Sequence, residues 1–251
     1  MIYIFNDVPY NNIFSLAKII YKNYNSFSKL FRQDENLLNF VKEQDKEKYE
    51  KLIKISKLYY PDDVFLFKVT YILNPFISLR IRDEQFSSYS DLGKKMLLSS
   101  PDISSKYFPL IQYDLISYHM EMTGFNKKDE ELFLKVKEIE KDEHKQYVYF
   151  YLAYLLSKKT TIIYHSEEYK DIYSFCYYIL KEEDDISSLG NILSEASFLK
   201  AYKDFSRDGK SISAYLHLCS QLKNSEEKLT IFLKKRDRKD YTILFIIFSV
   251  K

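Results

Sequence analysis

Histidine and cysteine, which carry much acid–base, nucleophilic and metal chemistry, number only four and two in this sequence of 251 residues. A metal site needs several converging ligands, and no paired-histidine spacing such as HExxH occurs. We therefore expect no catalytic or metal-binding residue, no cofactor, and a protein that is not an enzyme. A hydrolase with a histidine–carboxylate site built on His119 or His165 is kept as the second alternative. The histidines are His119, His144, His165 and His217.

The cysteines and the acidic runs receive structural interpretations. Cys176 and Cys219 lie far apart with no CxxC spacing, which favours a reducing compartment over a disulfide scaffold. The acidic runs at 129–131 and 182–185 lack the alternating oxygen ligands of a calcium loop. We interpret both runs as solvated carboxylates.

A basic run near the C-terminus is the best candidate for contact with nucleic acid. Asp237 and Asp240 dilute its charge, and the net charge of the chain is only +2, so no broad basic surface is expected. Nucleic-acid binding through residues 234–239 is therefore the first alternative function. The candidate residues are Lys234, Lys235, Arg236, Arg238 and Lys239.

Composition bears on class and location. The chain has only four glycines, which disfavours folds that need glycine-rich turns to approach phosphate. The N-terminus lacks the basic region of a signal peptide, and the most apolar stretch, residues 242–250, is about half of what a membrane-spanning helix requires. We expect a cytoplasmic protein that does not contact a membrane.

Internal similarity organises the chain more clearly than any motif. Residues 64–73 align with 147–156, and the same gapless register continues from 79–105 onto 162–188. A third copy begins at Ile2. Self-similarity at a fixed period is typical of repeat architectures. The sequence predicts three diverged tandem modules, over residues 1–74, 75–157 and 158–251.

Each module is predicted to begin with a short β-hairpin that leads into a helix, with the first strands at 2–5, 78–81 and 161–164. One equivalent position holds Asn12, Ser88 and Asp171, whose side-chain oxygens make them favoured helix N-caps. A second holds Ala17, Gly93 and Cys176, all small, as expected where a neighbouring backbone passes close. This position favours a structural thiol at Cys176 over a nucleophile.

Each module is predicted to close with a helix that is hydrophobic nearly all round, at 64–73, 147–156 and 242–250, and buried between neighbours. A charged helix over 41–57 precedes the first, and residues 234–239 form a solvated loop before the last. The predicted fold class is α+β and predominantly helical, each module being a short β-hairpin followed by about three helices. Short linkers predict that the modules pack as one continuous array.

Stacked modules present an extended surface, and repeat arrays commonly use such surfaces to hold another macromolecule. We therefore expect a non-catalytic protein-interaction module, acting as an adaptor or inhibitor, whose partner is another protein. The patterns specify no oligomeric state.

Overall fold

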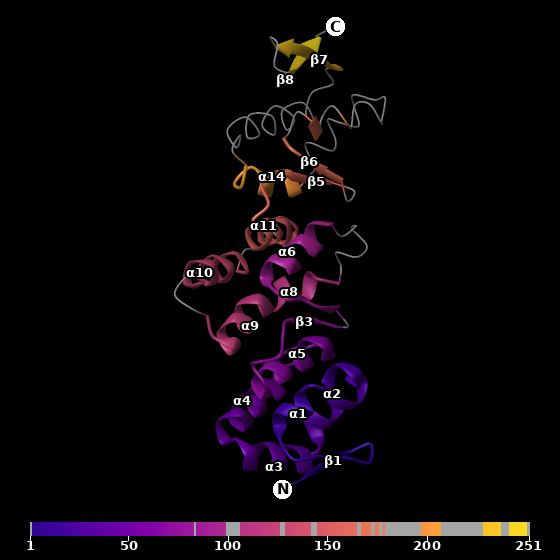
Figure 1. Ribbon diagram of the computed structural model, residues 1–251, viewed down its shortest axis with the longest axis vertical. Coiled ribbons are helices and arrows are strands. Elements are labelled where there is room, and N and C mark those ends of the chain that lie inside the picture. Colours follow the sequence, from indigo (N-terminus) through magenta and orange to yellow (C-terminus); the bar gives the residue numbers. More distant parts are fainter. Residues whose placement is uncertain are drawn as a thin grey trace. The chain divides into compact units, whose positions relative to one another are not determined.

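Figure 1 shows a computed structural model of the chain, in which the described residues are mostly helical with a few short antiparallel hairpins. The chain divides into two compact units: unit 1 comprises residues 1–88 and 105–143, and unit 2 comprises residues 89–104 and 144–251. This division differs from the three modules inferred from the sequence, whose boundaries stay a prediction. The described residues are 2–82, 84–98, 106–125, 129–141, 145–164, 167–171, 174, 175, 178, 197–206, 228–236 and 241–249.

Unit 1 contains hairpins and most of the described helices. Its strands are β1 (Tyr3–Phe5), β2 (Val8–Tyr10), β3 (Arg80–Ile81) and β4 (Glu84–Gln85). Its helices are α1 (Ile13–Ala17), the short 3-10 helix η1 (Ile20–Lys22), α2 (Tyr24–Gln33), α3 (Glu35–Gln44), α4 (Lys46–Ser56), α5 (Asp62–Leu73), α8 (Phe108–Gln112), α9 (Leu115–Thr123) and α10 (Glu130–Ile139).

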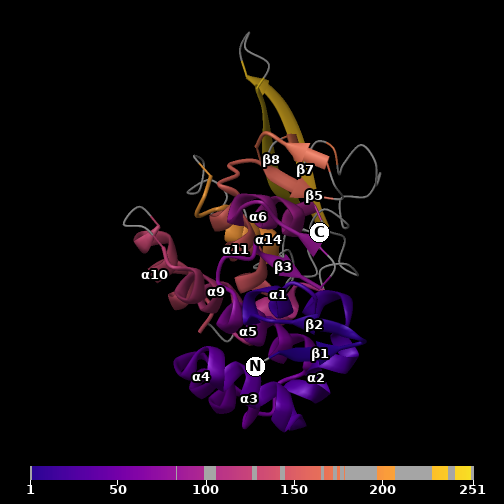
Figure 2. The ribbon, with the colours of Figure 1, turned by 60° about the horizontal axis from the view of Figure 1, so that its bottom comes forward.

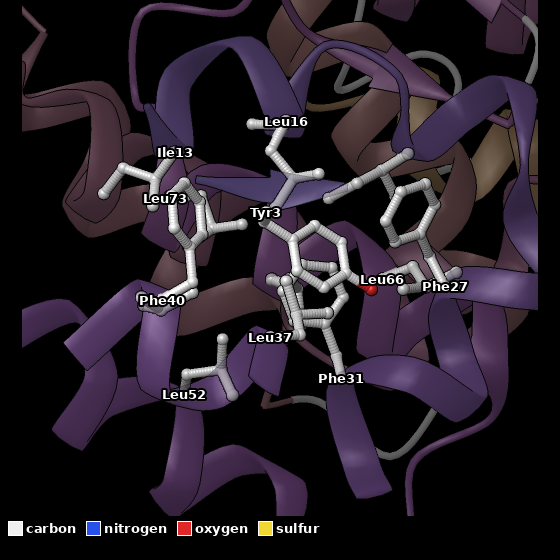
Figure 3. Packing of buried hydrophobic residues seen from close by; sticks show 14 of the residues in the cluster. Tyr3, Ile13, Leu16, Phe27, Phe31, Leu37, Phe40, Leu52, Leu66 and Leu73 are labelled. Atoms are coloured by element: carbon white, nitrogen blue, oxygen red, sulfur yellow. The ribbon is translucent and has the colours of Figure 1, made fainter. Parts of the chain in front are cut away.

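Helix α5 forms the centre of unit 1. Every residue from Val64 to Leu73 is buried, and the helix contacts α1, α2, α4 and α9. The prediction of a buried helix over 64–73 is therefore confirmed. Figure 3 shows how side chains from the first hairpin and from helices α1 to α5 converge in this core, with Tyr3, Phe40 and Leu66 among them. Burying an aliphatic or aromatic side chain of this size stabilises the fold by roughly 1.5–3 kcal/mol.

Aspartates set the helix boundaries in this unit. The Asp34 carboxylate accepts from the backbone N–H groups of Asn36 and Leu37, and Asp45 accepts from that of Lys48. Such N-caps satisfy donors that have no partner within the helix. The predicted helix over 41–57 is consequently wrong at its start, because α3 ends and α4 begins at the Asp45 cap.

All three predicted hairpins are present. Tyr3 pairs with Tyr10, Arg80 with Gln85, and, in unit 2, Ile162 pairs with Tyr169. Residues Asn6 and Asp7 both have positive φ, at 48° and 61°. This is the backbone of a tight hairpin turn, in which asparagine and aspartate are tolerated. In Figures 1 and 2 the β1–β2 hairpin lies beside α2 and α3. The ring centres of Phe5 in β1 and Phe27 in α2 are 4.4 Å apart.

Two of the three predicted N-caps are seen directly. Asn12 Oδ1 accepts from the Ser15 N–H at 2.8 Å, and Asp171 Oδ1 accepts from the Ser174 N–H at the same distance. Ser88 stands immediately before α6 (Tyr89–Leu98), at the predicted helix start. The three hairpin-to-helix starts therefore occur where the sequence predicted them.

Unit 2 is centred on α11 (Lys145–Ser157), which packs against α6 and α14 (Ser197–Tyr202). A Cβ added at Gly93 would lie 2.8 Å from the Ala153 carbonyl oxygen of α11 and would also collide with the Ser157 backbone nitrogen. This confirms the predicted close approach at Gly93. Cys176, at the aligned position, lies outside the described residues.

The predicted closing helix at 242–250 is wrong. Strand β8 (Tyr241–Ser249) occupies this stretch and pairs antiparallel with β7 (Lys228–Arg236). Both segments are rich in the β-branched and aromatic residues that favour strands, and a short apolar run does not distinguish helix from strand by period alone. The remaining strands of unit 2 are β5 (Ile162–Tyr164) and β6 (Glu167–Tyr169). Across the described ranges, no helix has the length and apolar character needed to span a bilayer.

Candidate functional site

A surface groove of about 730 Å³ lies in unit 1, between α1 with η1 and the segment 74–80 that connects α5 to β3. Grooves of this size hold a few side chains or a small molecule rather than a folded domain. Its walls combine aromatic and basic residues. The aromatic, aliphatic and basic residues of the lining are Phe14, Lys18, Lys22, Phe76, Ile77 and Arg80.

Asn74 builds the outer wall of the groove. It is buried at the end of α5, and the Pro75 that follows restricts it to an extended backbone, with φ −145° and ψ 94°. Its Nδ2 donates to the Phe14 carbonyl oxygen at 3.3 Å, and its Oδ1 accepts from the Phe76 N–H at 3.1 Å. One side chain therefore joins the two walls and fixes the backbone at Phe76.

Tyr71 holds the other end of the segment. Its ring is fully buried in α5, and its hydroxyl donates to the Ser78 carbonyl oxygen at 3.2 Å and accepts from the Arg80 N–H at 2.9 Å. The segment between α5 and β3 is therefore fixed by side chains at both ends. A backbone held in this way positions its exposed side chains precisely for binding.

Two phenylalanines border the groove and face solvent. Phe76 is 86% exposed and Phe14 is 41% exposed. A single exposed aromatic is ordinary on a protein surface. Phe14 and Phe76 border the same groove, and the half-buried Ile77 of its lining packs against the core of unit 1.

The charge at the groove is positive. Lys18 and Lys22 are exposed, whereas the Arg80 guanidinium donates to Gln85 Oε1 at 2.6 Å. Lys48 supports the wall from behind, with its Nζ 4.4 Å from the centre of the Phe14 ring. None of the described residues that line the groove is an aspartate or glutamate.

A buried charge cluster occupies another part of unit 1. Lys68 of α5 is 7% exposed, and its Nζ lies 4.2 Å from the centre of the Tyr118 ring and 5.0 Å from that of Tyr60. Burial lowers the pKa of Lys68, and the carboxylates of Asp114 and Glu140 oppose that shift. Aromatic faces stabilise a cation that has lost water, so the cluster has a structural explanation.

Glu140, a carboxylate of the same cluster, has a structural role at the start of α9. Its carboxylate accepts from the backbone N–H groups of Ile116 and Ser117, at 3.1 and 3.4 Å, in the first turn of α9. Burial raises the pKa of Glu140 to about 7, against the opposing effect of those hydrogen bonds. Asp114, at the N-cap position of α9, has left-handed backbone and makes no capping bond with its side chain. Glu140 caps the helix instead.

Of the histidines considered for a histidine–carboxylate site, the structure describes His119, which is buried in α9. Burial lowers the pKa of His119 to about 4, and its ring packs edge-on against Tyr71 at 4.3 Å. Glu121 pairs with Lys137 at 2.7 Å. Within the described ranges, no group of three or more histidine, cysteine or acidic side chains is placed to hold a metal. Residues outside the described ranges include His144, His165 and His217.

The structure places Lys234, Lys235 and Arg236 on β7, so the prediction of a solvated loop is wrong for these three. Arg238 and Lys239 lie outside the described residues. Sequence reasoning did not identify the groove. The Asn74–Pro75 pair indicated a junction between modules. Phe76, the aromatic residue directly after it, was the sequence signal that could have indicated the groove.

Comparisons with known proteins yield no relative: no family model, curated protein or solved structure matches the chain. The groove in unit 1 is therefore the candidate functional site. Its components are the exposed rings of Phe14 and Phe76, the ammonium groups of Lys18 and Lys22, and the fixed backbone at Asn74.

Proposed function

We propose that this protein is a non-catalytic interaction protein that binds a partner protein in the groove beside α1. The observation that carries this proposal is Phe76, a large apolar side chain that is 86% exposed on a backbone held by Asn74. Aromatic side chains of this kind are typical anchors of protein interfaces. Burying Phe76 in a complex would contribute roughly 1.5–3 kcal/mol.

The fixed backbone supports the same conclusion. Binding costs free energy when it orders flexible segments, so a surface that is already ordered keeps more of its contact energy. Hydrogen bonds from Asn74 and Tyr71 hold the segment that carries Phe76 at both ends. The groove therefore needs little rearrangement to receive a partner.

The proposal includes the three tandem modules over residues 1–74, 75–157 and 158–251. Stacked repeats present an extended surface that commonly holds another macromolecule, and we assign the contact to the junction between the first two modules. Binding without chemistry makes the protein an adaptor or an inhibitor of its partner.

The test is site-specific photo-crosslinking in the native host, with the full-length protein. One variant carries the photoreactive residue at Phe76, and a matched control carries it at Lys159, the aligned position after α11. We expect one protein, identified by mass spectrometry, to crosslink at position 76 and not at 159. The purified partner should then bind the wild-type chain and lose affinity for Phe76→Lys.

Three results would overturn the proposal. The first is the absence of any protein adduct at position 76. The second is an adduct with RNA or DNA at that position. The third is the same set of adducts at positions 76 and 159, which would show adhesion without a specific site.

A further inference from the structure

We infer that the groove beside α1 takes an acidic, extended segment of the partner, which inserts an aromatic or large aliphatic side chain between Phe14 and Phe76. This inference rests on the proposed function and specifies the chemistry of the partner. It combines the charge of the groove, its apolar rim and its size.

The charge favours an acidic partner. Lys18 directly follows α1, Lys22 is the last residue of η1, and both line the groove and are exposed. Within the described part of the chain, neither ammonium group is paired with a carboxylate. Acidic side chains brought to the groove would meet two cations and no lining carboxylate. Complementarity of this kind raises the rate of encounter and excludes basic partners.

The exposed rings of Phe14 and Phe76, which form the apolar rim of the groove, favour a partner that offers an apolar side chain as well as charge. Phe14 and Phe76 face solvent at opposite walls, which Asn74 connects through its hydrogen bond to the Phe14 carbonyl oxygen. An occupant that offers only carboxylates would leave both rings in water. A side chain that packs against both rings gains hydrophobic contact and orients the segment.

The size of the groove favours a single extended segment. A volume of about 730 Å³ accommodates several side chains, not a folded domain. A single strand of nucleic acid would need cations along a longer path and stacking faces for successive bases. Here Arg80 already donates to Gln85, and two lysines remain. The observations therefore favour an acidic peptide over a nucleic acid.

The absence of tryptophan from the chain allows a direct binding assay. Phe76→Trp keeps an aromatic ring at the rim and introduces the sole indole as a fluorescent reporter. The full-length variant is titrated with a synthetic peptide of glutamates around a central phenylalanine. Comparison probes replace every glutamate by glutamine, replace the phenylalanine by alanine, or consist of oligothymidylate.

We expect the indole emission to shift to shorter wavelength and saturate with the acidic peptide. Either peptide replacement should weaken binding by at least about tenfold. The variant Lys18→Glu with Lys22→Glu should lose binding. The matched control is Lys54→Glu with Lys57→Glu, which makes the same charge change at exposed residues outside the groove and should retain binding.

Several results would overturn the inference. Equal binding of the glutamine peptide would remove the role of charge, and equal loss in both lysine variants would remove the role of the groove. Saturable binding of oligothymidylate without binding of the peptide would assign the site to nucleic acid. If no peptide binds while a protein still crosslinks at position 76, this inference fails and the proposed function stands.

Discussion

The junction after α5 in unit 1 and the junction after α11 in unit 2 share one backbone-fixing hydrogen bond and differ in the residue that follows it. We call these residues, Phe76 and Lys159, the tips of the two junctions. Asn74 Oδ1 accepts from the Phe76 N–H at 3.1 Å, and the aligned Ser157 Oγ accepts from the Lys159 N–H at 3.2 Å. Both side chains are buried at the end of a hydrophobic helix. Two different residue types therefore perform the same local function at aligned positions.

A buried tyrosine lies one turn before each of these supports, and here the junctions begin to differ. The hydroxyl of Tyr71 bonds to the backbone of Ser78 and Arg80. The aligned Tyr154 lies near the Ile163 N–H without forming a hydrogen bond, and burial raises its pKa. In unit 2 it is the Tyr202 hydroxyl that donates to the junction, at the Thr160 carbonyl oxygen.

The two junctions differ in the side chains at positions 76 and 159. Phe76 follows Pro75 and is exposed, whereas Lys159 follows Lys158, which has a φ of 57°. The Lys159 ammonium bonds to both oxygens of Glu168, at 2.8 and 2.9 Å. Similar supports thus carry an available aromatic ring at one junction and an ion pair at the other. The two junctions therefore differ most in the side chains at positions 76 and 159.

The largest expected effect concerns the helix pairs that carry the two junctions. Ala17 is buried in α1, whereas Gly93 at the aligned position touches the α11 backbone. Gly93→Leu should lower the free energy of unfolding by at least about 3 kcal/mol, since a clash with backbone is relieved only by moving the helices. Urea denaturation of the full chain measures this value. A loss below about 1 kcal/mol would show that α6 and α11 pack less closely than described.

Glu140 in unit 1 and Glu168 in unit 2 should contribute to the pH dependence of stability with opposite signs. The pKa of Glu140 is raised to about 7, so between its usual pKa of 4.5 and pH 7 the folded chain binds more protons than the unfolded chain. The contribution of Glu140 to the free energy of unfolding should therefore fall as pH rises through this window, by on the order of 2–3 kcal/mol. His119, whose pKa burial lowers to about 4, contributes with the opposite sign below its usual pKa. Glu140→Gln should remove the Glu140 contribution and leave that of His119. Unchanged pH dependence in that variant would exclude Glu140 as the source.

Glu168 provides the contrasting case in unit 2. Hydrogen bonds from Lys159 and Thr161 hold the pKa of Glu168 below its usual range. Its contribution to stability is therefore present near neutral pH and is lost as pH falls below that usual range. Glu168→Gln should reduce acid sensitivity only slightly, because the pair is exposed and screened by solvent. An effect as large as that of Glu140→Gln would contradict this assignment.

A smaller effect is expected from the tyrosine hydroxyls. Tyr71→Phe removes the hydroxyl that donates to the Ser78 carbonyl oxygen and accepts from the Arg80 N–H. This change should lower the free energy of unfolding by about 1–2 kcal/mol, because it leaves two backbone groups without these partners. Tyr154→Phe should cost less than about 0.5 kcal/mol, since its hydroxyl makes no hydrogen bond to the described residues. Thermal denaturation of both variants compares the costs directly. Equal costs would show that the two junctions are supported alike.

Local signals in the sequence were sufficient for much of the fold. Asn12 and Asp171 cap helices because their short polar side chains suit that position, and Gly93 is small because a backbone passes there. The apolar character of residues 64–73 predicted their burial. In each case a short-range physical requirement selects the residue type, so one sequence is enough to detect it.

Features that depend on tertiary context were not predictable. The apolar stretch at 241–249 is a strand because β7 pairs with it, and its period alone did not distinguish strand from helix. Glu140 caps a helix distant in sequence, which no local pattern indicates. Phe76 is exposed on a backbone held by Asn74, whereas a phenylalanine is expected in the core from its residue type alone.

An exchange of the side chains at positions 76 and 159 shows most directly whether Phe76 anchors the partner. Isothermal titration calorimetry measures the affinity of the full-length chain for the partner identified by crosslinking at position 76. Phe76→Lys should weaken binding by at least about tenfold, Lys159→Phe should leave it unchanged, and the combined variant should bind as weakly as Phe76→Lys alone. Wild-type affinity in Phe76→Lys, or loss of affinity in Lys159→Phe, would contradict a binding site at the first junction.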